Sequence, residues 1–473
     1  MPRASGAPVS YEEFLKNKEI VAEAMGFDAD IRGDHLFPFQ RDLVRWACRR
    51  GRAAIFAGTG LGKTRMQLEW AKQVVGHTGE RVLILAPLVV AEQTVDEGRG
   101  VGIPVEYARK GDGCEAPIVI TNYEMRQHFD TDIFAGIVLD ESSCIKDETS
   151  ATRTELIESF AETPFRLCCT ATPSPNDFAE LGNHSEFLGI MRRTEMLSSF
   201  FVHDGETTQD WRLKGHARDA FWKWVSSWGA MVKSPSDLGY PNDGYELPPL
   251  WTIQHTVAAT AEQARAQGRL FAEKARTLSD QRSARNASMN DRVSLAAGVI
   301  GEELHEPWLV WCELNAESEA LTKAIPGALE ITGAMSHEAK RTRLLAWLAG
   351  DFNVLVTKPS VAGFGLNAQR CARQMFVGVS HSFEQYFQAV RRCWRFGQTR
   401  EVVVHLVVAE LEGAVRDNLR RKEAEAEVQS EEMRKYTRDY VQANIRKATR
   451  EQDPYDPKVK MKIPKWVRSS KDG

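Results

Sequence analysis

The chain has 473 residues, of which 42% are hydrophobic and 27% charged, and its formal net charge is −4. This length exceeds what one compact core organises, so we expect two or three domains. The slightly acidic balance excludes a uniformly basic nucleic-acid-binding protein, although a local basic groove can coexist with an acidic exterior.

The first predicted element is an N-terminal helical segment over residues 1–35. Ser10 and Glu13 have the spacing of a capping box, which predicts a helix that ends near Met25. The opening residues lack the apolar core of a signal peptide, and no apolar run is long enough to cross a bilayer. The eight cysteines include no Cys-x-x-Cys pair, which favours reduced, buried thiols over a structural zinc. We therefore expect a cytoplasmic protein without a membrane partner.

Short apolar runs alternate with helix-favouring stretches over residues 36–188. This pattern is typical of a parallel sheet covered by helices on both faces, and it predicts a first α/β domain. The predicted strands are Ala53–Phe56, Val82–Ala86, Ile118–Thr121, Ile137–Leu139 and Phe165–Thr170.

A glycine-rich turn follows the first of these strands. It departs from the commonest P-loop only in having Ala57 at the first glycine position. Such a turn between a strand and a helix points consecutive backbone N–H groups at one anion, whereas a glycine-rich stretch taken alone is often only a turn. Lys63 is expected to neutralise the β- and γ-phosphates of ATP, and Thr64 to bind Mg²⁺. The expected phosphate-binding residues are Gly58, Thr59, Gly60, Leu61, Gly62, Lys63 and Thr64.

Two acidic residues end the strand Ile137–Leu139. The carboxyl edge of a parallel sheet is where ligands bind, so Asp140 is the expected partner of Mg²⁺ and Glu141 the expected base or positioner of the attacking water. An Asp-Glu pair after an apolar run is by itself most often a solvated strand end. Downstream of a P-loop it favours a site that binds and hydrolyses ATP.

Residues 189–304 are predicted to form a helical insertion and an inter-lobe region, and this range is rich in tryptophan. Trp224 and Trp228 are four residues apart and share a helix face, which favours core packing over base stacking.

A second α/β pattern occupies residues 305–408, and residues 409–473 are predicted to be a charged helix and a basic tail. The tail lysines either add affinity for DNA or only solubilise the chain. The predicted strands of this domain are Trp308–Trp311, Ala328–Ile331, Val354–Val356, Gln374–Val379 and Val402–Val408.

A basic run from Gln388 to Gln398 lies within this second pattern. Arg392 and Arg395 are three residues apart and would share one helix face. Isolated arginines of this kind most often form a solvated helix face. P-loop ATPases also use an arginine to stabilise charge on the γ-phosphate in the transition state, so both residues are catalytic candidates.

The order of these motifs and their residues resemble helicase superfamily two, most closely its Swi/Snf-type DNA-translocase branch, from about Leu36 to Val408. The compact layout is similar to the stand-alone ATPases of bacteria and their phages, so the resemblance implies the bacterial cytoplasm or a phage-infected host cell. It implies two tandem RecA-like parallel-sheet lobes with helical insertions and a C-terminal helical extension. It also implies an ATP-dependent motor that moves along nucleic acid, with sequence-nonspecific double-stranded DNA as the expected partner.

The resemblance carries over residue roles at the matching motifs. Gln40 corresponds to the glutamine that recognises adenine, Gly365 to a second-lobe nucleotide contact, and Arg395 to the arginine finger, with Arg392 beside it. The implied contacts with the nucleic-acid backbone are Pro87, Leu88, Thr121, Asn122, Tyr123, Thr357 and Lys358. The residues implied to couple hydrolysis to lobe movement are Thr170, Ala171, Thr172 and Gln388.

Two motifs depart from the family pattern. The run Asp140-Glu141-Ser142-Ser143 has serine where relatives often carry histidine, and Ser380–Phe383 stands where the branch often has Trp-Asn-Pro. The long insertions of eukaryotic remodellers are shortened here, so nucleosome handling is not expected.

Other functions remain open from the sequence. A strand-separating helicase on DNA or RNA has no distinguishing residue signature, and a nucleotide-gated clamp would bind DNA with little turnover. If the P-loop lies on one lobe and the finger on the other, the site is complete only when the lobes close. Binding of the two lobes to the phosphate backbone of a nucleic acid would then be insensitive to base sequence and weakened by salt.

Overall fold

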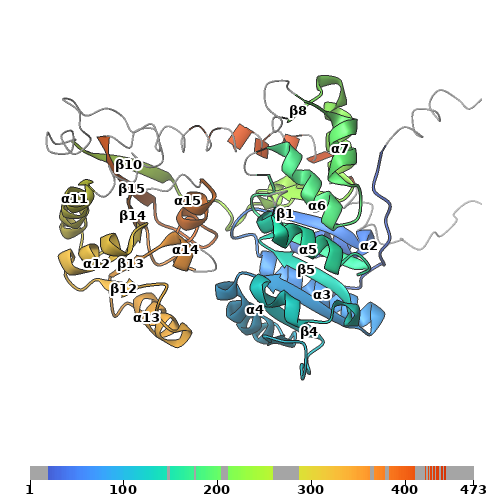
Figure 1. The fold of residues 1–473 in the computed structure, drawn as a ribbon, viewed down its shortest axis with the longest axis horizontal. Coiled ribbons are helices and arrows are strands. Elements are labelled where there is room, and N and C mark those ends of the chain that lie inside the picture. Colours follow the sequence, from blue (N-terminus) through green and yellow to red (C-terminus); the bar gives the residue numbers. More distant parts are fainter. Residues whose placement is uncertain are drawn as a thin grey trace, which may run out of the picture.

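The computed structural model describes residues 20–145, 150–174, 177–203, 211–258, 287–362, 367–378 and 383–410, and several positions between 421 and 443. Two α/β units lie side by side, each built around one parallel sheet (Figure 1). The predicted α/β class is therefore confirmed, with two parallel sheets of seven and six strands.

The first sheet has the order β3-β4-β2-β5-β6-β1-β9, and all of its strand pairs are parallel. Because β6 lies between β1 and β5, a single strand separates the P-loop from the two acidic residues at the carboxyl edge. The strands are β1 Arg52–Ala57, β2 Arg81–Ala86, β3 Val105–Tyr107, β4 Ile118–Asn122, β5 Phe134–Asp140, β6 Phe165–Thr170 and β9 Gly229–Val232.

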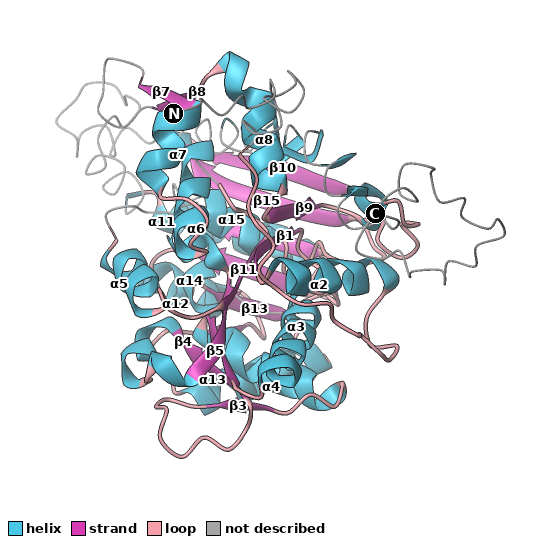
Figure 2. Cartoon of the chain, turned by 90° about the vertical axis from the view of Figure 1, so that its right-hand side faces the viewer, coloured by secondary structure: helices cyan, strands magenta, loops and turns pink. Residues whose placement is uncertain are grey.

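Helices cover both faces of this sheet, with α2, α3 and α4 on one side and α5 and α6 on the other (Figure 2). Alternate residues of β1 supply the two cores, since Ile55 packs with the first set and Phe56 with the second. The helices are α2 Pro38–Arg50, α3 Lys63–Thr78, α4 Leu88–Gly100, α5 Ala151–Ser159, α6 Leu181–Phe187, α7 Arg193–Phe200 and α8 Arg218–Ser226.

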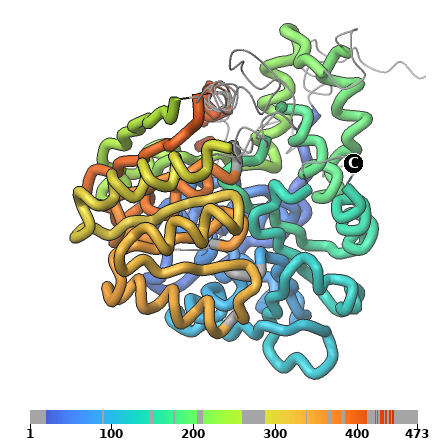
Figure 3. Tube along the Cα trace, turned by 60° about the vertical axis from the view of Figure 1, so that its left-hand side comes forward, coloured from blue at the N-terminus to red at the C-terminus, as the bar shows by residue number. Residues whose placement is uncertain are grey.

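The second sheet has the order β10-β15-β14-β11-β13-β12 and is also parallel throughout. Figure 3 shows this unit as the yellow-to-orange part of the trace, beside the blue-to-green first unit. Its strands are β10 Leu250–Val257, β11 Trp308–Cys312, β12 Leu329–Ile331, β13 Val354–Thr357, β14 Arg373–Val377 and β15 Val402–Ala409. Its helices are α11 Met289–Glu302, α12 Asn315–Ala324, α13 His337–Ala349, α14 Pro359–Ala362 and α15 Phe383–Val390.

All ten predicted strands are present with small differences at their ends, but β3, β9 and β10 were not predicted. The range 189–304, predicted as an insertion and inter-lobe region, contains an edge strand of each sheet. Edge strands of this kind lack a strong apolar signal: β9 has four residues, and β10 exposes Trp251 and Ile253. The same range forms a small antiparallel hairpin from β7 Phe201–His203 and β8 Trp211–Leu213.

The predicted N-terminal helix is wrong over the part that the structure describes, because residues 20–36 contain no helix. Residues 1–19, including Ser10 and Glu13, lie outside the described residues. Backbone N–H groups from Met25 to Phe27 instead donate to carbonyls at the end of α2. Gly26 is required at this contact, since an added Cβ would lie 1.8 Å from the Cys48 carbonyl oxygen.

The described positions between 421 and 443 are helical, as predicted for the charged C-terminal segment. They return to the first unit, where Met433 is buried in the core and Arg434 forms an ion pair with Asp237 at 3.1 Å. Residues 204–210 and 259–286 of the predicted insertion and inter-lobe region, and the basic tail, lie outside the described residues. None of the described helices has the length and apolar content needed to cross a bilayer.

The tryptophans of the insertion belong to the core of the first unit. Trp222, Trp224 and Trp228 have no exposed surface, and Trp224 and Trp228 pack ring against ring at 5.4 Å. The prediction of core packing is confirmed for Trp224 and Trp228. A base-stacking role is excluded for them in this conformation.

Candidate functional site

The glycine-rich turn after β1 opens directly into α3. Gly62 is the N-cap of that helix in the left-handed conformation, and Gly60 also has a positive φ, of 90°. The N–H groups of the first helical turn have no partner within the helix, so this turn presents donors to an anion. Lys63 is the first helical residue, and its Nζ donates to the Ala57 carbonyl at 3.2 Å.

Gln40, the predicted adenine contact, is buried beside this turn. Its Oε1 accepts the Phe37 N–H at 2.9 Å, and its Nε2 donates to the Leu61 carbonyl at 2.8 Å. A Cβ on Gly62 would lie 2.3 Å from that Nε2. The Gln40 side chain therefore links the start of α2 to the P-loop by two hydrogen bonds.

The two acidic residues occupy the end of β5. Asp140 is buried, and Gln67 Nε2 donates to its Oδ1 at 2.6 Å. Burial, followed by the neighbouring Glu141 carboxylate, raises the pKa of Asp140 to about 6. A divalent cation beside these carboxylates would relieve the cost of their charge, and Thr64 lines the same cavity, so this donor set fits Mg²⁺.

Gln67 was not predicted, although its position gave a signal. It lies four residues after Lys63 and so faces the same side of α3, where a buried polar side chain needs a partner. An amide that holds a metal-binding carboxylate in one orientation is a common outer-shell feature of metal sites.

Glu141 adopts a positive φ of 53°, the only described residue other than glycine to do so. Thr170 Oγ1, at the end of β6, donates to Glu141 Oε2 at 3.3 Å and accepts the Thr172 N–H at 3.2 Å. Of the predicted coupling residues, Thr170 therefore contacts the predicted base, and Thr172 contacts Thr170. A strained conformation held by neighbouring groups is typical of functional turns.

Ser142, which follows the two acidic residues, is buried against a histidine from another element. Its Oγ shares a hydrogen bond with His184 Nε2 of α6 at 3.1 Å, and the His184 ring packs on Phe56 at 5.3 Å. Burial lowers the pKa of His184 to about 4, so the ring is neutral.

The second unit contributes two arginines. Arg392 is 5% exposed, and its guanidinium donates to the Gln388 side-chain oxygen at 2.7 Å. Burial lowers the pKa of Arg392 to about 10, and the Glu141 and Asp140 carboxylates partly oppose that shift. Burial also lowers the pKa of Arg395. Gln388, predicted to couple hydrolysis to movement, therefore orients Arg392.

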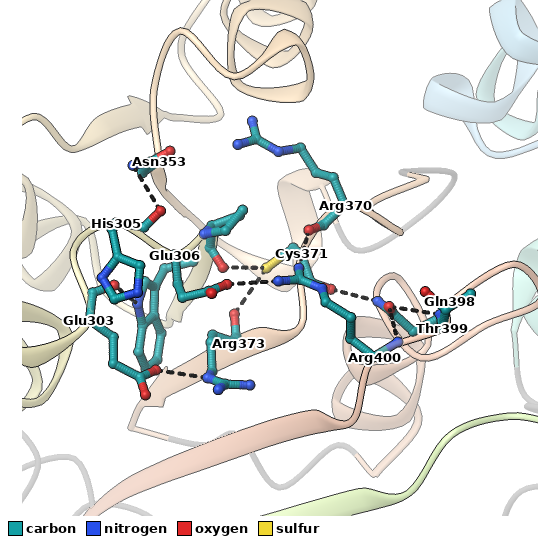
Figure 4. Close-up of polar contacts among 12 residues, drawn as sticks. Glu303, His305, Glu306, Asn353, Arg370, Cys371, Arg373, Gln398, Thr399 and Arg400 are labelled. Atoms are coloured by element: carbon teal, nitrogen blue, oxygen red, sulfur yellow. Dashed lines mark hydrogen bonds and ion pairs between the residues drawn. The ribbon is translucent and has the colours of Figure 1, made fainter.

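The loop over residues 391–401 that carries these arginines is fixed by a polar network (Figure 4). Arg400 bonds the Glu306 carboxylate at 2.8 Å, and Gln398 Oε1 accepts the N–H groups of Thr399 and Arg400. The Gln398 amide nitrogen donates to the backbone oxygens of Gln369, Cys371 and Cys393. These three hydrogen bonds from one side chain to the backbone restrict the conformation of the loop.

One cavity of about 550 Å³ collects most of the predicted nucleotide residues from both units. This volume suits a ligand of nucleotide size. The predicted residues that line it are Gln40, Thr59, Gly60, Gly62, Lys63, Thr64, Asp140, Glu141, Arg392 and Arg395. Gly58 and Leu61 line a second cavity, of about 460 Å³, which shares Thr59 and Gly60 with the first and also borders Ala171 and Thr172.

The predicted nucleic-acid contacts lie outside the nucleotide cavity, at the carboxyl ends of other strands. Pro87 follows β2, Thr121 and Asn122 end β4, and Thr357 ends β13. Thr121 and Thr357 are fully buried, whereas Lys358 is half-buried.

Tyr123 follows Asn122 and points inward, since its hydroxyl donates to the Asp140 carbonyl at 2.7 Å. Gly365 and the side chain of Leu88 lie outside the described residues.

Comparisons of the chain with protein-family models and with curated proteins found no match.

We expect His184 to make stability depend on pH. The unfolded chain binds a proton at the ordinary histidine pKa of about 6.5, whereas the folded chain keeps His184 neutral down to about pH 4. This contribution is full above pH 6.5 and is lost as the pH falls towards 4. Between pH 8 and pH 5, the free energy of unfolding should fall by about 2 kcal/mol more in wild type than in His184→Gln.

Urea unfolding followed by tryptophan fluorescence at both pH values measures this difference. His216→Gln is the matched control because His216 is exposed, and it should behave as wild type does. An equal loss of stability in His184→Gln and wild type would contradict a buried neutral His184.

Proposed function

We propose that the protein is an ATP-dependent nucleic-acid translocase of helicase superfamily two, close to its Swi/Snf-type branch, with two RecA-like lobes. One observation carries the proposal: Lys63, the Asp140–Glu141 pair and Arg395 line a single cavity, although the arginine comes from the other unit. A cavity of this composition suits a triphosphate, since it places two carboxylates and several cationic or N–H donors around one space.

In this proposal the N–H groups of the P-loop and Lys63 hold the β- and γ-phosphates. Thr64 and Asp140 hold Mg²⁺, with Gln67 orienting the Asp140 carboxylate. When bound, the cation would neutralise charge on the phosphate oxygens. Glu141 accepts a proton from water while the water oxygen attacks the γ-phosphorus and the bond to the ADP oxygen breaks. Arg392 and Arg395 stabilise the charge that develops on the transferred group.

Coupling to movement follows from the contacts of the catalytic groups. Glu141 contacts Thr170, whose hydroxyl also bonds the Thr172 backbone, and Arg392 is oriented by Gln388. A change in phosphate charge at Glu141 and Arg392 would thus reach both units through defined hydrogen bonds. Binding of ATP would favour the closed arrangement, and hydrolysis would favour its opening.

The nucleic-acid partner is supported by the motif resemblance and by the position of the matching residues at carboxyl strand ends of both sheets. Double-stranded DNA is the proposed track. A strand-separating helicase and a nucleotide-gated clamp with little turnover are the alternatives, and the experiments below distinguish all three.

The first test concerns the catalytic residues. We expect Arg395→Ala to lower kcat for ATP hydrolysis by roughly 10³-fold or more, because a transition-state charge loses its partner. Arg391→Ala is the matched control: Arg391 lies over the Trp394 ring at 4.3 Å and does not line the nucleotide cavity, so its loss should be far smaller. Steady-state phosphate release measures both variants.

Glu141→Gln in the same assay separates a motor from a clamp. Equal turnover in Glu141→Gln and wild type would contradict the assignment of an ATPase at this site. Equal rates for the two arginine variants would remove Arg395 from the proposed role.

The second test concerns the track. ATP hydrolysis by the wild type should be stimulated by double-stranded DNA of any sequence, and the stimulation should decline steeply between about 50 and 200 mM salt. Parallel measurements with duplex DNA, single-stranded DNA and RNA identify the partner. Stimulation by RNA alone would overturn the proposed track, and displacement of a labelled strand would favour the helicase alternative.

A further inference from the structure

A second cavity lies beside the nucleotide cavity and has no assigned role in the proposed ATP hydrolysis. Its volume is about 460 Å³, which is within the range of small-molecule sites. Residues of the first unit, of α15 and the loop after it, and of the C-terminal segment line it together. Thr59, Gly60, Tyr245 and Phe396 line both cavities and therefore lie between them.

Most of the lining of the second cavity is apolar. Aliphatic side chains come from both units, and aromatic rings come mainly from α15 and the loop after it. Among the apolar lining residues are Leu247, Leu250, Tyr386, Phe387, Val390 and Trp394. A lining of this kind favours a ligand with a flat apolar body over a small inorganic ion.

Arg391 brings a positive charge into this apolar lining. Its guanidinium lies over the Phe387 ring at 5.0 Å and over the Trp394 ring at 4.3 Å. Its Nε is buried and has no hydrogen-bond partner among the described residues. Burial lowers the pKa of Arg391 to about 10, which reflects the cost of removing this charge from water. Arg391 does not line the nucleotide cavity, so its charge faces the second cavity alone.

The other charged groups of the second cavity compensate each other. Among the described residues, Glu427 is the only acidic one that lines it, and its carboxylate pairs with Lys233 Nζ at 2.9 Å. Two cations and one carboxylate leave one positive charge, which is that of Arg391. A carboxylate suits this charge, because it can accept two parallel hydrogen bonds from a planar guanidinium.

Two buried hydroxyls also line the second cavity without a partner. Thr59 Oγ1 and Thr172 Oγ1 have no hydrogen bond to the described residues. Buried polar groups are normally paired, and water molecules could pair with these two hydroxyls. Water cannot compensate the charge of Arg391, however, so the three unpaired groups together indicate an organic anion.

We propose that the second cavity binds a small monocarboxylate with a flat apolar body, and that the bound ligand slows ATP turnover without competing with ATP. The carboxylate pairs with Arg391, and the body packs on the apolar lining. The site itself is independent of the proposed function, whereas the effect on turnover rests on it.

The effect on turnover follows from what the ligand would contact. Thr172 belongs to the first unit, and its N–H bonds the Thr170 hydroxyl that contacts Glu141. Arg391 and α15 belong to the second unit. A ligand held by both units loses contacts when they separate, so it opposes the opening that follows hydrolysis.

Calorimetric titration of the full-length protein with naphthalene-2-carboxylate and with its neutral analogue naphthalene-2-carboxamide tests the site. The two probes share the flat apolar body, and only the first carries a charge. We expect the carboxylate to bind wild type at least about tenfold more tightly than the carboxamide, because a charge-assisted pair is lost in the carboxamide. Arg391→Met should remove this difference and still bind the carboxamide, since its apolar stem is kept.

Arg341→Met is the matched control, because Arg341 is an exposed arginine of the second unit that lines neither cavity, and it should keep the preference. Pyrophosphate with Mg²⁺ should leave the affinity for the carboxylate unchanged, since phosphates are expected in the other cavity. Displacement by pyrophosphate would place the probe on the P-loop and overturn the site. Equal affinity of wild type for the two probes, binding of neither, or the same preference in Arg391→Met as in wild type would overturn it as well.

Steady-state ATP hydrolysis with saturating naphthalene-2-carboxylate tests the second half of the proposal. We expect kcat to fall about fivefold or more while KM for ATP does not rise, as for a ligand coupled to the nucleotide site from a separate cavity. An unchanged kcat, or a KM that rises with probe concentration, would overturn the effect on turnover. Absence of hydrolysis in wild type would refute the translocase and leave the calorimetric result in force.

Discussion

The two units meet where the arginine-bearing loop rests on the P-loop, and the rest of the site depends on this contact. Gly60 has a positive φ of 90° and lacks a side chain where the Phe396 backbone passes, so the second unit approaches without a steric barrier. Trp394 of the same loop donates its indole N–H to the Pro248 carbonyl at 2.7 Å. A side chain at Gly60 would push this loop away and open the cavity that both units line.

Charge explains why such a contact favours a polyanion with a cation. Asp140 and Glu141 are adjacent and line this cavity, with Asp140 buried, and Arg392 of the second unit lines the same cavity, buried and with a lowered pKa. Two unit charges about 4 Å apart interact by about 4 kcal/mol at an effective dielectric constant near 20. A ligand group of opposite charge would therefore stabilise the carboxylates or the guanidinium strongly. A magnesium-bound triphosphate supplies both signs at once, which is the physical basis for reading the cavity as a nucleotide site. In the proposed function, this charge compensation favours closure of the two units.

The sequence carried enough information for the sheets and for one half of the site, and the reasons are physical. The P-loop and the Asp140–Glu141 pair each lie at the end of a largely buried strand, so their place at one sheet edge is set locally by strand and turn chemistry. Gln67 and His184 were missed because their partners, Asp140 and Ser142, are distant in the chain. The edge strands β9 and β10 were missed because they are short or half exposed. The predicted N-terminal helix does not extend over residues 20–25, and the backbone of the next residues, Met25 to Phe27, bonds the end of α2.

The most direct measurement is an experimental structure of the protein with Mg²⁺, ADP and a metal fluoride in place of the transferred phosphoryl group. We expect the fluoride group to lie between Lys63 and Arg395, with Glu141 facing it from the β5 side. A complex in which the fluoride group contacts Lys63 while the Arg395 guanidinium points away, with the second unit withdrawn from Gly60, would contradict a site shared between two closing units.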